Sequence, residues 1–150
     1  MEQNEIISAC CLLLTIAKAD EILEDEEIKN IKEIIIDFFN IETNKIDHII
    51  NESMNILENS TDIFEFGRNL NNSLSYQDKI DFLCCTFEVA FSDGELHYLE
   101  EHAIKKIAAI FNLNHKDIID SKKEIEKYHP IKRIGDSKEI ANAALFLSTD

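Results

Sequence analysis

One stretch of this chain occurs twice, and that duplication limits the available folds more than any other feature. The first copy runs from Ala17 to Glu27 and the second from Ala90 to Glu100, 73 residues further on. Identical residues recur at this spacing at Cys11/Cys84, Ala17/Ala90, Asp20/Asp93, Leu23/Leu96, Glu27/Glu100, Ile31/Ile104, Lys32/Lys105, Ile34/Ile107 and Phe38/Phe111. Such internal similarity predicts that the chain builds the same unit twice.

Apolar residues on both sides of each copy follow the 3.6-residue period of a helix. Residues 5–19 present a wide apolar face, and a second apolar stripe covers residues 28–39. No alternating pattern indicates a strand. We therefore predict an all-α bundle of about seven to eight helices, built from two pseudo-symmetric helix-hairpin repeats at about residues 5–58 and 75–128.

Short polar side chains that cap helices stand ahead of the other apolar stripes. We predict helix N-caps at Thr43, Thr61 and Asn114, and the second copy starts at Ser75. Pro130 is the only proline, and it ends the helical pattern. The expected organisation is a helical domain over residues 1–129 and a tail helix over residues 130–150.

The net charge of −15 on 150 residues restricts the partners of the chain. Residues 115–150 hold equal numbers of acidic and basic residues, so the first 114 carry the whole charge. Nucleic acid is excluded as a partner because phosphate binding needs a basic face. An acidic body suits cations or a basic protein surface. No apolar run has the length to insert into a membrane. Glu2 and Glu5 occupy the region where a signal peptide carries basic residues, so we do not expect secretion.

The four cysteines form two adjacent pairs, Cys10-Cys11 and Cys84-Cys85, inside apolar helical stretches. Neighbours on a helix point about 100° apart, so neither pair has a usual zinc spacing. We expect buried, reduced thiols, as in a cytoplasmic protein.

Each copy also brings carboxylates together across a turn between two helices. Clustered carboxylates repel each other unless a cation neutralises them, and several oxygen ligands suit Ca²⁺ or Mg²⁺. The candidate metal ligands are Asp20, Glu24, Glu27, Asp93, Glu95 and Glu100. The spacing does not match an EF-hand loop, because Ile22 and His97 fall where that loop needs ligands.

A second interpretation of the same acids involves no metal. Asp20 and Asp93 would accept backbone N–H bonds in the turns, and Glu27 and Glu100 would stabilise the first turn of the following helix. Spacing alone leaves both interpretations open.

The repeated motif resembles the TerB (tellurite resistance protein B) family over roughly residues 5–128. The second copy, with Ala90, Asp93, Gly94 and Glu100, matches the family pattern better than the first, in which Glu21 replaces the glycine. The resemblance implies an all-α fold of two helical repeats and a cytoplasmic protein without enzymatic activity or organic cofactor. It also implies a role in tellurite resistance or stress response, with protein partners that in some members lie at the membrane, and a metal site at the repeated acids.

The tail resembles a different family. Pro130, Arg133, Gly135 and the segment 139–141 are similar to the C-terminal segment of short-chain dehydrogenases. The chain has only three glycines and no βαβ pattern, so it lacks the phosphate-binding turn of a dinucleotide-binding enzyme. We predict no enzymatic activity, and the apolar run 145–147 offers a surface for a homodimer.

The sequence is therefore compatible with two functions. The first is a cation-binding acidic module in tellurite resistance or stress response. The second is a metal-free adaptor whose acidic face captures a basic protein partner.

Overall fold

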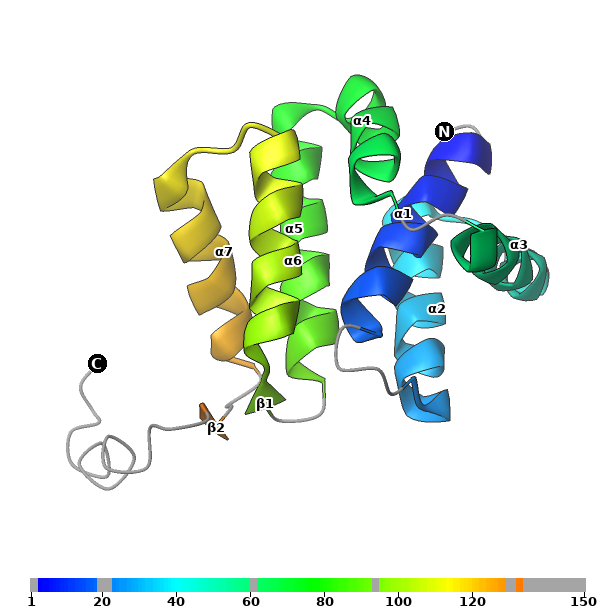
Figure 1. The fold of residues 1–150 in the computed structure, drawn as a ribbon, viewed down its shortest axis with the longest axis horizontal. Coiled ribbons are helices and arrows are strands. Elements are labelled where there is room, and N and C mark those ends of the chain that lie inside the picture. The colour runs from blue at the N-terminus through cyan, green and yellow to red at the C-terminus, as the bar shows by residue number, and fades with distance from the viewer. Residues whose placement is uncertain (1–2, 19–22, 60–61, 93–94, 129–131, 134–150) are drawn as a thin grey trace.

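Seven α-helices make up most of the described chain, which in this computed structural model comprises residues 3–18, 23–59, 62–92, 95–128 and 132–133 (Figure 1). The helices are α1 (Gln3–Ala17), α2 (Asp25–Phe39), α3 (Ile46–Asn59), α4 (Ile63–Ser73), α5 (Tyr76–Phe91), α6 (Tyr98–Ile110) and α7 (His115–Glu126). A short 3₁₀ helix, η1 (Thr43–Lys45), precedes α3, and two strands of two residues each are β1 (Glu95–Leu96) and β2 (Lys132–Arg133). The prediction of an all-α bundle is confirmed.

The duplication appears as two helical hairpins, α1–α2 and α5–α6. Glu24 and His97, the N-cap residues of α2 and α6, are 73 residues apart, as in the sequence repeat. An asparagine with positive φ also follows each second helix: Asn40, the C-cap of α2, has a φ of 55°, and Asn112, one residue past the C-cap of α6, has a φ of 56°. Asparagine tolerates this left-handed conformation, which lets the chain leave the helix and satisfies the last carbonyls.

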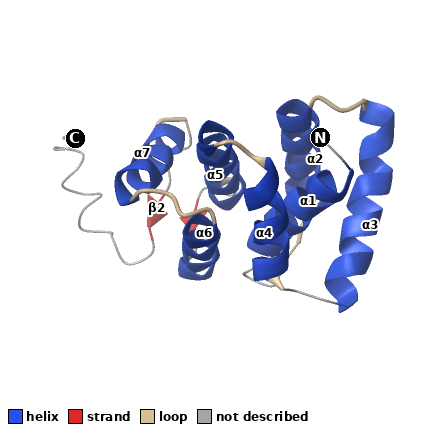
Figure 2. Cartoon of the chain, turned by 90° about the horizontal axis from the view of Figure 1, so that it is seen from above, coloured by secondary structure: helices blue, strands red, loops and turns tan. Residues whose placement is uncertain are grey.

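Helix α1 forms the centre of the first half because almost every position along it is apolar. The five residues from Cys10 to Leu14 have no exposed surface. The helix packs against α2, α3, α4, α5 and α6, and the views in Figures 1 and 2 show these helices around it. Helix α5 has the corresponding place in the second half and packs against α1, α2, α6 and α7. The two hairpins thus share one core through α1 and α5.

Strand pairing is the feature that the sequence did not predict. β1 and β2 form a parallel pair in which Glu95 aligns with Lys132 and Leu96 with Arg133. Segments of two residues are too short to show an alternating pattern. The pair places the chain that follows α7 beside the second acidic turn.

The structure confirms one of the three predicted N-caps, Asn114. The hydroxyl of Ser75 accepts a hydrogen bond from the backbone N–H of Asp78, and Asn114 is the N-cap of α7. Two predictions were wrong: Asp62 caps α4 in place of Thr61, and Thr43 lies within η1. An ionised carboxylate one residue later makes the stronger cap, and it accepts from the backbone of Phe64 and Glu65. Of the predicted tail helix over residues 130–150, only Lys132 and Arg133 are described, and they form β2 instead of a helix; the rest lies outside the described residues.

Candidate functional site at the acidic turns

Glu27 and Glu100, the repeated glutamates, occupy the same position in the two hairpins. Each lies at the third position of its helix, in α2 and in α6. Glu27 Oε1 accepts a hydrogen bond from the backbone N–H of Glu24 at 2.9 Å, and Glu100 Oε1 accepts one from His97 at 3.2 Å. Both glutamates are buried, with 9% and 1% of their surface exposed. The fixed 73-residue spacing of these acids therefore has a structural explanation, since each carboxylate closes the start of a helix.

The structure describes only part of the other predicted ligands. The side chain of Glu24 is exposed at the start of α2. Glu95 aligns with Lys132 in the short strand pair through its backbone. Asp20 and Asp93 lie outside the described residues, as does the side chain of Glu95.

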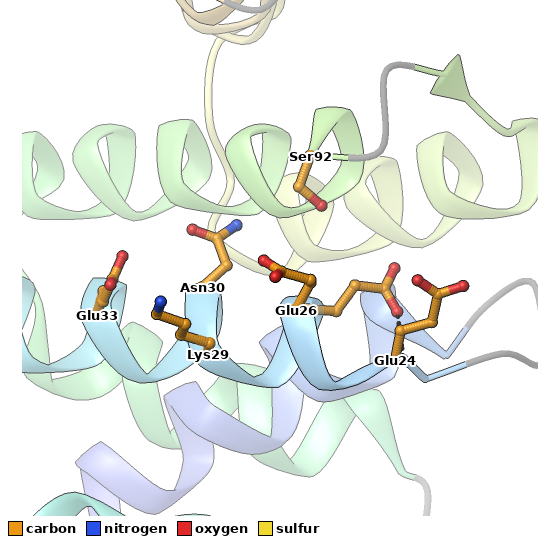
Figure 3. A pocket seen from close by; sticks show the side chains of 7 residues that line it. Glu24, Glu26, Lys29, Asn30, Glu33 and Ser92 are labelled. Carbon is orange, nitrogen blue, oxygen red and sulfur yellow. Dashed lines mark hydrogen bonds between the residues drawn. The ribbon is translucent and has the colours of Figure 1, made fainter.

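A pocket of about 510 Å³ lies where the start of α2 meets the end of α5 (Figure 3). Its lining residues are Glu24, Glu26, Glu27, Lys29, Asn30, Glu33 and Ser92. Figure 3 shows Glu26 and Asn30 of α2 directed toward α5, and the hydroxyl of Ser92 directed back toward α2. Ser92 directly precedes Asp93 in the chain. The fold thus brings the acids that follow the first turn to the residue at which the second turn begins.

A second hollow of about 300 Å³ continues from this pocket along the same two helices. The two hollows share Asn30 and Glu33. The second is lined by Asn30, Glu33, Ile34, Asp37, Phe38, Asp81, Cys85 and Glu88. We call the two hollows together the α2–α5 groove.

Acidic side chains of the α2–α5 groove outnumber its single lining cation, Lys29. The acids are Glu24, Glu26, Glu27, Glu33, Asp37, Asp81 and Glu88. The ligands predicted from the sequence did not include Glu26, Glu33, Asp37, Asp81 or Glu88. A signal does exist in the sequence. Residues 26, 30, 33 and 37 of α2 lie on one helix face, and residues 81, 85 and 88 of α5 with its C-cap residue 92 repeat the same spacing.

The cysteines are free, and their surroundings keep them protonated. Burial raises the pKa of Cys10 to about 12 and that of Cys11 to about 11. Cys85 is half-buried in the groove, and its pKa is raised to about 12, by burial first and by the nearby charge of Glu88 second. Burial also raises the pKa of Cys84. Because the thiolate is the reactive form, these thiols are poor nucleophiles at neutral pH.

Among the described residues, no three or more histidine, cysteine, aspartate or glutamate side chains are grouped so as to hold a metal ion. No helix in this part of the chain is both long and apolar enough to cross a membrane.

The fold and the site define a class of protein: an all-α module of two helical hairpins with acidic residues at each hairpin turn. The family described as tellurite resistance protein TerB matches residues 6–123, and the chain belongs to this family. TerB proteins are non-enzymatic helical domains associated with tellurite resistance. The match stops before residues 130–150, so it lends no support to the dehydrogenase-like tail. No curated protein and no solved structure matched the chain.

Proposed function

We propose that this TerB-family domain binds a divalent cation, Ca²⁺ or Mg²⁺ in preference, where the two acidic turns meet. The binding would serve tellurite resistance or a wider stress response in the cytoplasm, without catalysis. The observation that supports it is the pocket that Glu24, Glu26 and Glu27 share with Ser92, the neighbour of Asp93.

The donor types of this pocket suit a hard cation, but its described acids are not grouped so as to hold one by themselves, so the proposed site also requires Asp20 and Asp93. Its described acids offer carboxylate oxygens, and Asn30 and Ser92 add a carbonyl and a hydroxyl oxygen. Glu27 already holds the backbone of Glu24, so it is the least adaptable of the acids. Asp20 and Asp93 remain predicted ligands from the sequence repeat.

Thermal unfolding of EDTA-treated protein, with and without millimolar Ca²⁺, Mg²⁺, Mn²⁺ or Zn²⁺, tests the proposal. A cation at about 100 times its dissociation constant adds about 2.7 kcal/mol to the stability of the folded state. For a domain of this size the midpoint would rise by about 5–10 °C. We expect Glu24→Gln with Asp93→Asn to abolish the shift, because this pair removes one carboxylate from each turn.

The matched control is Glu52→Gln with Glu58→Gln, two exposed acids on α3, which changes the net charge equally. This control should retain the full shift. An unchanged midpoint with all four cations would refute the proposal, and so would equal loss of the shift in both double variants.

A second candidate function is a metal-free adaptor whose acidic face captures a basic protein partner. The hydrogen bonds of Glu27 and Glu100 favour it, because they give the repeated glutamates a role that requires no cation. The charge of −15 favours it as well, since such a surface steers basic partners toward itself.

A further inference from the structure

We infer that the α2–α5 groove is the docking surface for a basic amphipathic helix of a partner protein. The inference deepens the adaptor function and rests on it. The groove is formed by one face of α2 and one face of α5, which pack against each other. Because α2 belongs to the first hairpin and α5 to the second, the groove exists only where the two hairpins pack together.

The floor of the groove is apolar. Ile34 is buried with 7% of its surface exposed, and Phe38 and Cys85 are half-buried beside it. Phe38 is held in place by edge-to-face contacts with Phe39 and with Phe82 of α5, at ring centroid separations of 4.8 and 5.7 Å. A rigid aromatic floor of this kind suits an aliphatic side chain that is inserted from above.

Carboxylates form both walls above this floor. Glu33 and Asp37 are exposed on α2, while Asp81 is exposed and Glu88 half-buried on α5. None of the ion pairs among the described residues involves Glu33, Asp37 or Glu88. Their charges are therefore available to a partner.

The dimensions and charge identify the occupant. The lining of the groove runs from residue 26 to 37 along α2 and from 81 to 92 along α5, and each pair of positions lies eleven residues apart, which is about 16 Å at 1.5 Å per residue. That length accommodates about three turns of a helix lying between α2 and α5, which is a common way for helical proteins to bind a partner segment. Two carboxylate walls around an apolar floor complement a helix with an apolar stripe between two rows of Lys or Arg. A second copy of this chain is a poor occupant, because its net charge is also −15.

A designed peptide tests the inference directly. The probe is an acetylated and amidated 14-residue helix of leucine and lysine, with leucine in one stripe, lysine on both flanks and a fluorescent label. Its anisotropy is measured against the full chain in EDTA, so that the cation site has no part in the result. A peptide of the same composition with the leucine and lysine positions shuffled reports charge attraction alone.

The decisive comparison uses two triple variants. Glu33→Gln, Asp37→Asn and Glu88→Gln neutralise the walls, and Glu52→Gln, Glu58→Gln and Glu65→Gln neutralise three exposed acids on α3 and α4. We expect the wall variant to weaken binding of the patterned peptide about tenfold, equivalent to about 1.4 kcal/mol. The control should change it less than about twofold, and the shuffled peptide should bind more weakly than the patterned one.

Three results would overturn the inference. Equal weakening by both triple variants would mean that the peptide binds by unspecific charge attraction. The adaptor function would then remain possible, but the groove would not be its docking surface. No binding of the patterned peptide to the unaltered protein would refute both the groove as a docking surface and the adaptor function. A homodimer that the wall variant dissociates would identify a second copy of the chain as the occupant. Neutralising acids on an acidic protein reduces self-repulsion, and circular dichroism verifies that each variant is folded.

Discussion

Replacement of the two repeated glutamates separates their structural role from any role in binding. Glu100→Ala removes the oxygen that accepts the backbone N–H of His97, at a position with 1% exposure. Loss of a helix cap costs about 1 kcal/mol, and loss of a hydrogen bond to a charged group costs about 1.5–3 kcal/mol. We therefore expect Glu100→Ala to lower the free energy of unfolding by about 1–3 kcal/mol. Glu27→Ala should behave similarly, because its carboxylate makes the equivalent bond at 2.9 Å.

Urea denaturation in EDTA is the assay, because it excludes any contribution from a bound cation. Glutamine keeps a side-chain oxygen at the same place, so Glu27→Gln and Glu100→Gln should retain more stability than the alanine variants. The control Glu58→Ala, at an exposed position on α3, should change stability by less than about 0.5 kcal/mol. If both alanine variants are as stable as the original chain in EDTA, the capping explanation of the sequence repeat is refuted.

Two further predictions concern the core. At Gly67 in α4 an added Cβ would lie 2.9 Å from Cγ2 and Cδ1 of Ile110, so Gly67→Ala should destabilise the fold by up to about 2 kcal/mol despite the better helix propensity of alanine. Combination with Ile110→Ala should cost less than the sum of the two single changes in urea denaturation, and strict additivity would argue against the clash. Cys10 and Cys85 each have a folded-state pKa of about 12, above the value of about 9 in the unfolded chain. Between these pH values the unfolded state loses its thiol protons first, so the free energy of unfolding is unaffected below about pH 9 and falls as the pH rises toward 12. Native protein at pH 8 should therefore react with iodoacetamide far more slowly than protein in urea, and equal rates would contradict this burial.

The sequence by itself determined the elements and their duplication. The wide apolar face of residues 5–19 predicted a largely buried helix, which is α1. The recurrence of Glu27 as Glu100 predicted matching helix starts, because the N–H groups at the start of a helix need acceptors wherever the helix lies. These are local requirements of the backbone, so they can be predicted from short stretches of sequence.

Only the tertiary structure decided what lies between the hairpins. Glu33 and Glu88 belong to different repeats and face each other across one groove because α2 packs against α5. The pairing of β1 with β2 likewise joins segments that no local pattern connects. Helical periodicity states which face of a helix is buried, but the neighbour that buries it depends on how whole side-chain surfaces fit together. The acids of the groove were visible in the sequence, whereas their assembly into one surface depended on that fit.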